Sequence, residues 1–311
     1  MRKTTLTVTE GIDLSGKTAL ITGSSSGIGR ECARVLALRG ARVLMANRNE
    51  QKTAAVVNVF ADTIGSEAAQ RCEFRHCDTA SMKTVRTIVD TIVHNREKID
   101  FLFLNAGVFG VPYRLTDDGF ENTMATNYIG HFLMTHALAM GQAFSPNARI
   151  IGTMTSGIYY NPFSKMDLAT LINASANEKN FKRANASPNS KVMLLYLIRE
   201  FARRVAETHL AGISALGADP GGTVTDNVNQ GGALVRTLIK IAQPFLMHSV
   251  EVGTAVLLWT ATNPALSESG GRVYDYKLNE TKLTGKCINA KSAELCWDTT
   301  EKVLGLQKLI A

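Results

Sequence analysis

Thr22-Gly23-Ser24-Ser25-Ser26-Gly27-Ile28-Gly29 is the stretch of this sequence that decides the fold. It follows an apolar run, 17–22, that predicts a buried strand, and it leads into an apolar-periodic segment, 27–38, that predicts a helix. Glycine allows the backbone to turn tightly there and to approach a pyrophosphate closely. The helix N-terminus offers unpaired N–H groups and a positive dipole end to the phosphates. The stretch therefore predicts a dinucleotide-binding turn.

Strand and helix patterns alternate along the rest of the chain. We expect strands at 17–22, 42–46, 72–77, 99–104, 149–153, 213–217 and 271–276, and helices at 27–38, 50–64, 81–94, 117–141 and 189–209. This alternation is typical of a parallel sheet with helices on both faces, a Rossmann-type doubly wound α/β fold. No repeat or Pro/Gly linker divides the chain, so we expect a single domain over 1–311, with a polar N-terminal extension at 1–13.

Two segments interrupt the alternation. Residues 156–186 are polar and rich in Asn, Ala and Ser, and residues 221–233 carry a glycine pair at each end. Long loops in compact domains are usually functional. We expect both segments to border a substrate cleft.

The composition is that of an ordinary soluble globular protein, with 45% hydrophobic and 20% charged residues. The formal charge of +7 comes from scattered basic residues, which argues against nucleic-acid binding and suits the recruitment of an anionic cofactor. The longest apolar run, 252–261, is too short to span a bilayer, and the N-terminus has no apolar leader. We expect a cytoplasmic protein without a transmembrane segment.

The five cysteines form no CxxC pair and have no histidine spacing that would suit zinc. An odd number of cysteines without framework spacing indicates reduced, buried thiols and a reducing compartment. The sequence therefore predicts no metal site.

The end of the second strand indicates which cofactor the turn binds. Enzymes that use NAD place a carboxylate about twenty residues after the glycine turn, where it binds the ribose 2′-hydroxyl. Here that region reads Ala46-Asn47-Arg48-Asn49, without a carboxylate. Arg48 can bind a 2′-phosphate through two hydrogen bonds, which favours NADP(H). The alternative is that Arg48 is a solvated surface residue.

Further motifs follow in order across almost the whole chain. The turn has TGxxxGxG spacing, Asp78 follows the third strand, Asn105-Ala106-Gly107 closes the fourth, and Asn127 opens the pattern N-x-x-G-H-F. Together with Pro220-Gly221 these motifs resemble the short-chain dehydrogenase/reductase family, in its branch of retinol dehydrogenases and WW-domain oxidoreductases. The resemblance implies seven strands in the order 3-2-1-4-5-6-7.

The turn, Arg48 and the resemblance together predict a set of residues that hold the cofactor. They are Gly23, Ser25, Ile28, Gly29, Arg48, Asp78, Asn105, Ala106, Gly107, Lys191, Pro220, Gly221, Thr223 and Thr225.

The resemblance also implies four catalytic positions. Family members use a serine after the fifth strand, a tyrosine, a lysine four residues after that tyrosine, and the asparagine at Asn127. Ser190-Lys191 matches the family's lysine helix, and counting back four residues gives Ser187 at the tyrosine position. Thr155 occupies the serine position and keeps a hydroxyl.

The missing tyrosine bears directly on the chemistry. A phenol ionises near pH 10 and can be shifted lower by a neighbouring ammonium, whereas an aliphatic hydroxyl ionises far less readily. Tyr159 and Tyr160, beside Ser156 in the cleft loop, are candidates for a substitute donor. Their alternative role is to line an apolar pocket.

Three functions are compatible with these residues. The favoured one is an NADP(H)-dependent oxidoreductase that acts on a lipophilic small molecule. The others are a non-redox catalyst (a cyclase, isomerase or dehydratase) and a catalytically silent NADP-binding protein. The family commonly forms dimers or tetramers through the helices after the fourth and fifth strands, so the resemblance also leaves a homo-oligomer open.

Overall fold

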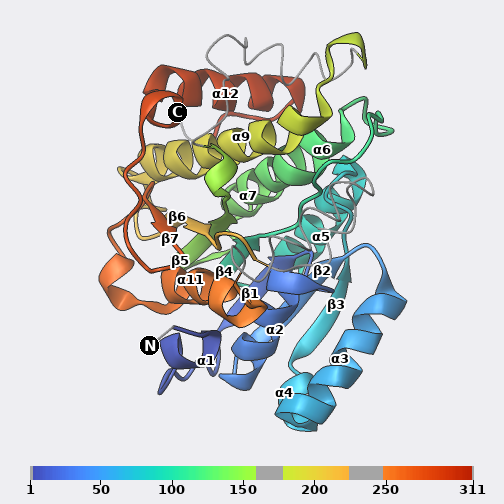
Figure 1. Ribbon diagram of the computed structural model, residues 1–311, viewed down its shortest axis with the longest axis vertical. Helices are drawn as coiled ribbons and strands as arrows, with labels where there is room; N and C mark the ends of the chain where they lie inside the picture. Colours follow the sequence, from blue (N-terminus) through green and yellow to red (C-terminus); the bar gives the residue numbers. More distant parts are fainter. Residues whose placement is uncertain (1–2, 159–177, 224–247, 310–311) are drawn as a thin grey trace.

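The structure, a computed structural model, describes residues 3–158, 178–223 and 248–309 (Figure 1). In these ranges seven parallel strands form one sheet in the order β3-β2-β1-β4-β5-β6-β7, which confirms the predicted Rossmann-type topology. The strands are β1 (Thr18–Thr22), β2 (Arg42–Asn47), β3 (Cys72–His76), β4 (Ile99–Leu104), β5 (Phe144–Thr153), β6 (Ser214–Asp219) and β7 (Val273–Asp275).

Helices cover both faces of the sheet, because alternate strand residues point to opposite sides. Leu20 and Leu44 face a core shared with α5 (Met82–His94), α7 (Gly130–Met140), α9 (Arg183–Val205) and α12 (Ala290–Val303). Ile21 and Val43 face a second core, shared with α2 (Gly27–Leu38), α3 (Glu50–Ile64) and α11 (Val250–Thr262). In Figure 1 the first group, with α12 outermost, lies above the sheet and α11 and α2 lie below it.

Several predicted bounds are confirmed, because their local signals are strong. The predicted 27–38 and 50–64 helices and the 99–104 strand have the bounds of α2, α3 and β4. Gly40, with a φ of 97°, ends α2: its N–H donates to Ala37 O, and the Ala41 N–H donates to Leu36 O. The five cysteines are buried free thiols.

Two long helices differ from their predicted bounds. The predicted 117–141 helix begins only at α6 (Asn122–Met124), because Gly119 adopts a φ of 81° in a turn that leads into Glu121, which caps α6. The predicted 189–209 helix is α9, which starts at Arg183 and ends at Val205. Residues 183–186 are thus helical and belong to α9, not to a loop. Pro188 lies in the second turn of α9.

The sequence patterns missed the short α1 (Thr5–Val8), α4 (Ser66–Ala69) and, most importantly, α12. The Trp297 ring of α12 packs edge-on against Phe132 of α7 at a centroid distance of 4.7 Å. Glu301 is buried and accepts hydrogen bonds from Trp297 Nε1 (2.7 Å) and from the Leu309 N–H (2.9 Å). Its α12 neighbour Asp298 pairs with Arg204 of α9 at 2.7 Å.

This position of α12 bears on oligomer formation. The resemblance placed an interface on the helices after the fourth and fifth strands, which are α7 and α9. Here α12 of the same chain packs on both of them. A homo-oligomer built through that face would have to displace α12. Within the described ranges, no helix combines the length and the apolar content that a membrane span requires.

We predict that Trp297 anchors α12 energetically. Trp297 is 2% exposed, so Trp297→Ala leaves a cavity and should lower the free energy of unfolding by about 3–5 kcal/mol. Leu295, on the same helix, is 50% exposed, and Leu295→Ala should change the free energy of unfolding by no more than about 0.5 kcal/mol. Urea unfolding followed by circular dichroism measures both, and equal losses would contradict the anchoring role.

Candidate active site

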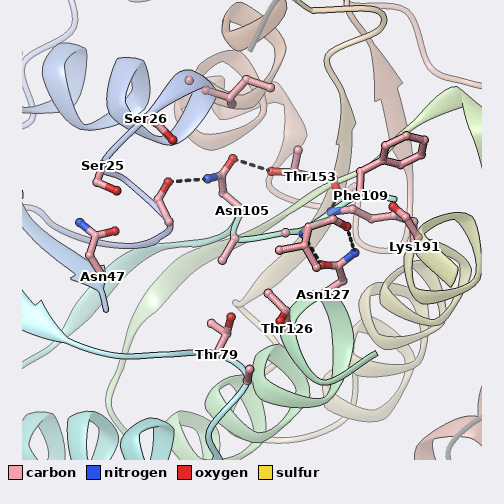
Figure 2. Close-up of a pocket in the computed structure, with 18 of the residues that line it drawn as sticks. Ser25, Ser26, Asn47, Thr79, Asn105, Phe109, Thr126, Asn127, Thr153 and Lys191 are labelled. Carbon is pink, nitrogen blue, oxygen red and sulfur yellow. Dashed lines mark hydrogen bonds between the residues drawn. The ribbon is translucent and has the colours of Figure 1, made fainter. Parts of the chain in front are cut away.

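A cleft of about 600 Å³ opens at the carboxyl edge of the sheet (Figure 2). Its walls come from the residues that follow β1, β2, β3, β4, β5 and β6, together with the first turn of α2 and the second and third turns of α9. In a doubly wound sheet this edge is where the strand order reverses and where ligands bind. The fold thus gathers distant parts of the sequence around one cavity.

Most residues predicted for the site lie in this cleft. Those that line it are Gly23, Ser25, Ile28, Arg48, Asp78, Asn105, Ala106, Gly107, Asn127, Thr155, Ser187, Lys191, Pro220, Gly221 and Thr223. Ser156 is exposed and does not line the cleft. Tyr159, Tyr160 and Thr225 lie outside the described residues.

Gly29 also does not line the cleft, and its position explains why glycine is required there. A Cβ at this position would lie 2.4 Å from Gly23 O and 2.5 Å from Asn105 Nδ2. Gly29 therefore lets α2 pack directly behind the turn, and Gly23 makes the turn with a φ of 68°. The glycines serve two purposes: one bends the chain and the other allows the close approach of the helix.

Hydrogen bonds from β4 hold the glycine turn. The Thr22 hydroxyl accepts the N–H groups of Asn105 (2.9 Å) and Ala106 (3.0 Å). The Asn105 amide donates to Thr22 O and Gly23 O, and its Oδ1 accepts a hydrogen bond from the Thr153 hydroxyl of β5 (Figure 2). The ends of β1, β4 and β5 are thereby fixed relative to one another.

Sequence reasoning did not give Asn47 a role at the site, although it ends β2 where NAD enzymes carry an acid. Its Oδ1 accepts the Ser24 N–H at 2.8 Å, and its Nδ2 donates to the Thr53 hydroxyl at 3.0 Å. The buried amide thus braces the glycine turn from the other side. The residue type was the signal: an amide can accept and donate at once, which a carboxylate cannot.

Basic side chains dominate the charge of the described cleft. Arg48 and Lys52 line it after β2, and Lys191 lines it at the other end. Asp78 is the one carboxylate among the described lining residues. A cavity with low-dielectric walls and a surplus of cations attracts an anionic ligand.

Asn127 lies in a π-helical turn, Ala125–Ile129, between α6 and α7. Its Oδ1 accepts the Val108 N–H at 2.8 Å, and its Nδ2 donates to Val108 O at 3.0 Å (Figure 2). The same Nδ2 donates to the Ser190 hydroxyl at 2.9 Å. The π turn directs the amide inward, as such turns often do at functional sites. Asn127 thus connects the loop after β4 to α9.

His131 supports this turn from below. Burial and the nearby Lys191 ammonium lower the pKa of His131 to about 3, so the imidazole is neutral. Nδ1 lies 3.1 Å from Asn127 O, which can only accept, so the proton is on Nδ1. Nε2 lies 2.9 Å from the Thr22 hydroxyl, whose single proton is shared between this nitrogen and Phe103 O at 3.1 Å. The ring has a structural role that ties α7 to the glycine turn.

Helix α9 carries Ser187 and Lys191 one turn apart, and both line the cleft. Lys191 Nζ donates to Thr153 O at the end of β5, at 2.7 Å. Burial lowers the pKa of Lys191 to about 8, although the nearby Asp219 carboxylate acts to raise it. Ser187 presents only a hydroxymethyl group to the cleft.

Comparisons with known proteins agree with this geometry. The sequence pattern of the family described as short chain dehydrogenase matches residues 17–166. Retinol dehydrogenase 12 of Mus musculus is 30% identical over 300 residues, which cover 96% of this chain and 90% of the relative. The chain belongs to the short-chain dehydrogenase family. The matched pattern ends before α9, so Ser187 and Lys191 lie beyond it.

Other known proteins are similar over most of the chain. The WW domain-containing oxidoreductase of Drosophila melanogaster is 32% identical over 272 residues, covering 88% of this chain and 64% of the relative. A crystal structure of an uncharacterized protein from Mycobacterium paratuberculosis superposes with a TM-score of 0.74 at 24% identity, over 96% of this chain and 97% of the other. That structural likeness concerns the fold alone.

The amide of Asn127 offers a test of the site's architecture. Asn127→Asp keeps the acceptor for Val108 N–H but removes both donors and buries an unpaired charge, which should lower the free energy of unfolding by about 3–5 kcal/mol. Asn122→Asp is the matched control, because its Oδ1 accepts from Arg114 and a carboxylate keeps that contact. Chemical denaturation compares the two. If both variants are as stable as the wild type, Asn127 does not hold the site together.

Proposed function

We propose that this short-chain dehydrogenase is an NADP(H)-dependent oxidoreductase that interconverts a carbonyl and an alcohol on a lipophilic small molecule, with an atypical active site in which Ser187 takes the tyrosine position. The observation that carries the proposal is the cleft itself. It joins a glycine turn at a helix N-terminus, a cationic rim after β2 and a buried lysine at the opposite end. Each feature suits a different part of one dinucleotide.

The residues at the β2 end fit the adenosine 2′-phosphate of NADP. Asn47 is neutral and is engaged with Ser24 and Thr53, so no carboxylate there repels a phosphate. Arg48 and Lys52 border the same part of the cleft, and Asp78 follows the neighbouring strand. Ser25 and Ile28, at the start of α2, would meet the pyrophosphate with their N–H groups.

The residues at the opposite end fit the reacting groups. When bound there, a nicotinamide cofactor supplies or accepts a hydride. Asn105, Ala106 and Gly107 would border the cofactor from β4, and Pro220, Gly221 and Thr223 from β6. Lys191 would donate hydrogen bonds to the ribose, and the Thr155 hydroxyl would polarise the carbonyl oxygen.

The walls at this end favour an apolar substrate. Phe109 lines the cleft and is 48% exposed, and Val108 and Met154 line it nearby. Exposed aromatic surface beside a polar reaction centre is typical of pockets for small organic molecules.

One observation favours a second function. Since Ser187 cannot act as a strong acid, the scaffold is also suited to a reaction without net redox, such as an isomerisation, with the nicotinamide bound as a passive group. That function predicts conversion of the substrate without any change in the absorbance of NADPH. A silent NADP-binding protein predicts no conversion at all.

We predict that Arg48 sets the cofactor preference. A lost charge-assisted hydrogen bond costs about 1.5–3 kcal/mol, so Arg48→Gln should weaken NADPH binding by about 10- to 150-fold and leave NADH binding unchanged. Arg272→Gln is the control, because Arg272 pairs with Glu280 outside the cleft. Nicotinamide fluorescence titration gives both affinities, and an unchanged affinity of Arg48→Gln for NADPH would refute the assignment.

The redox function is tested by restoring the missing side chain. Wild type and Ser187→Tyr are compared for NADPH oxidation over a panel of lipophilic aldehydes and ketones, with cofactor binding measured in parallel. A positioned general acid contributes about 10²–10⁴-fold, so the tyrosine variant should gain up to that factor where no other group of the cleft donates the proton, and little where another group already does. Failure of both proteins to oxidise NADPH despite binding it would exclude the redox function in favour of the other two.

A further inference from the structure

Ser187, at the position where the family resemblance expects a tyrosine, lies one helical turn from the buried Lys191 of the cleft. Ser187 and Lys191 lie four residues apart on α9, so their side chains share one face of the helix. Both line the cleft. Because the Ser187 side chain ends at its hydroxyl, α9 presents a hydroxymethyl group and an ammonium at these positions, with no phenol.

Hydrogen bonding fixes the Lys191 ammonium and leaves part of it available. The side chain is 8% exposed, and Nζ donates to Thr153 O at 2.7 Å. Within the described part of the chain, Lys191 pairs with no carboxylate. An ammonium has three donors, and one is engaged with Thr153. Among the described residues the other two donate to no side chain or carbonyl, so they are open to a ligand in the cleft, on the side that Thr155 also lines.

The titratable groups around Lys191 come from three neighbouring elements. Asp219 ends β6, adjacent to the Thr153–Ala218 pair of the sheet, and is 5% exposed. Burial raises the pKa of Asp219, with Asp275 of β7 raising it further and Lys191 lowering it. His131 of α7 is neutral, as described above. Asp219 is therefore the one described carboxylate that acts to keep Lys191 charged.

The protonation equilibrium of Lys191 suits proton exchange near neutral pH. Its pKa of about 8 results mainly from burial, partly offset by Asp219. The most effective acid–base residue has a pKa close to the working pH. Among the described groups that line the cleft, Ser187 and Thr155 are aliphatic hydroxyls, which ionise far above this range.

We propose that Lys191 is itself the acid–base residue of this site and that Asp219 is the positioning residue that maintains its charge. The assignment rests on the proposed redox function. In the reducing direction, the carbonyl carbon receives the hydride that the bound nicotinamide supplies, and the π electrons of the C=O bond form the new O–H bond with a proton from Nζ. The neutral amine regains a proton from water, so one NADPH and one proton are consumed per alcohol formed.

Chemical rescue distinguishes a Lys191 that transfers a proton from a Lys191 that only supplies a positive charge. Lys191→Ala should lower kcat by about 10²–10⁴-fold, and small primary amines should restore it in proportion to their acidity. Guanidinium supplies the charge without a transferable proton and should fail. Lys191→Arg should likewise keep NADPH affinity while kcat falls. Equal rescue by guanidinium, or full turnover of Lys191→Arg, would overturn the assignment.

A second measurement does not depend on turnover. In wild-type protein labelled with ¹³C at lysine Cε, the Lys191 resonance, assigned by its absence in Lys191→Arg, should titrate with a midpoint near pH 8. Asp219→Asn keeps the acceptor for the Gly221 N–H but removes the negative charge, so the midpoint should move to lower pH. A wild-type midpoint above pH 10 would overturn the acid–base role of Lys191. An unchanged midpoint in Asp219→Asn would overturn the positioning role of Asp219.

The pH profile of the reduction connects the two measurements. Since the ammonium is the reactive form, kcat should be constant at low pH and fall as the pH rises through the Lys191 midpoint. Asp219→Asn should move this fall to lower pH by the same amount. Turnover whose pH profile is independent of the Lys191 titration overturns the lysine assignment alone. Absence of turnover in the wild type overturns the proposed function and this assignment with it.

Discussion

The hydroxyl of Thr22 is the contact on which the rest of the site depends. It accepts two backbone N–H groups from the loop after β4 and bonds to His131 of α7. Through His131 the same network reaches Asn127, whose amide holds Val108 and Ser190. Buried polar groups cost free energy unless they are paired, so each link confines the next. One side chain thus aligns the glycine turn, the π turn and the start of α9.

The same network separates the cleft into two electrostatic environments. At the β2 end, Arg48 and Lys52 are exposed to solvent, where water and salt screen their charges. At the α9 end, Lys191 is buried, and burial shifts its protonation far more than a surface charge would be shifted. Cations of the same formal charge therefore suit the different roles that we propose for them: the exposed pair suits the attraction of an anion, and the buried one suits proton exchange.

Most of the fold could be predicted, because parallel strands and amphipathic helices leave local patterns. The bounds of α2, α3 and β4 follow from uninterrupted apolar runs and a glycine terminus. The start of α9 could not be found, because Ser187 and Pro188 weaken the helical signal, and it is the packing of the helix that overrides them. Helix α12 was missed because Trp297 and Glu301 hold it through contacts with Phe132 and His136 of α7, and the sequence does not show these contacts.

The site shows the same division. Arg48, Asn127 and Lys191 were found because each stands at a fixed distance from a recognisable motif. Asp219 could not be predicted from its sequence neighbours. The pairing of β5 with β6 brings it near Lys191, and nothing in the sequence before Pro220-Gly221 indicates that pairing. Contacts between residues far apart in the chain lie beyond local patterns.

The side chain at position 187 affects the protonation of Lys191, because the two residues lie one turn apart on α9. A phenol four residues before the lysine would share its proton with the ammonium, and as a phenolate it would stabilise the lysine's charge. With serine in that position, burial acts on Lys191 against the opposing influence of Asp219 alone among the described carboxylates. In the site that we propose, the carboxylate at the end of β6 favours the charged form of the lysine, as a phenolate in that position would. In that proposed site the proton donor is therefore a nitrogen of α9 and not a phenol oxygen.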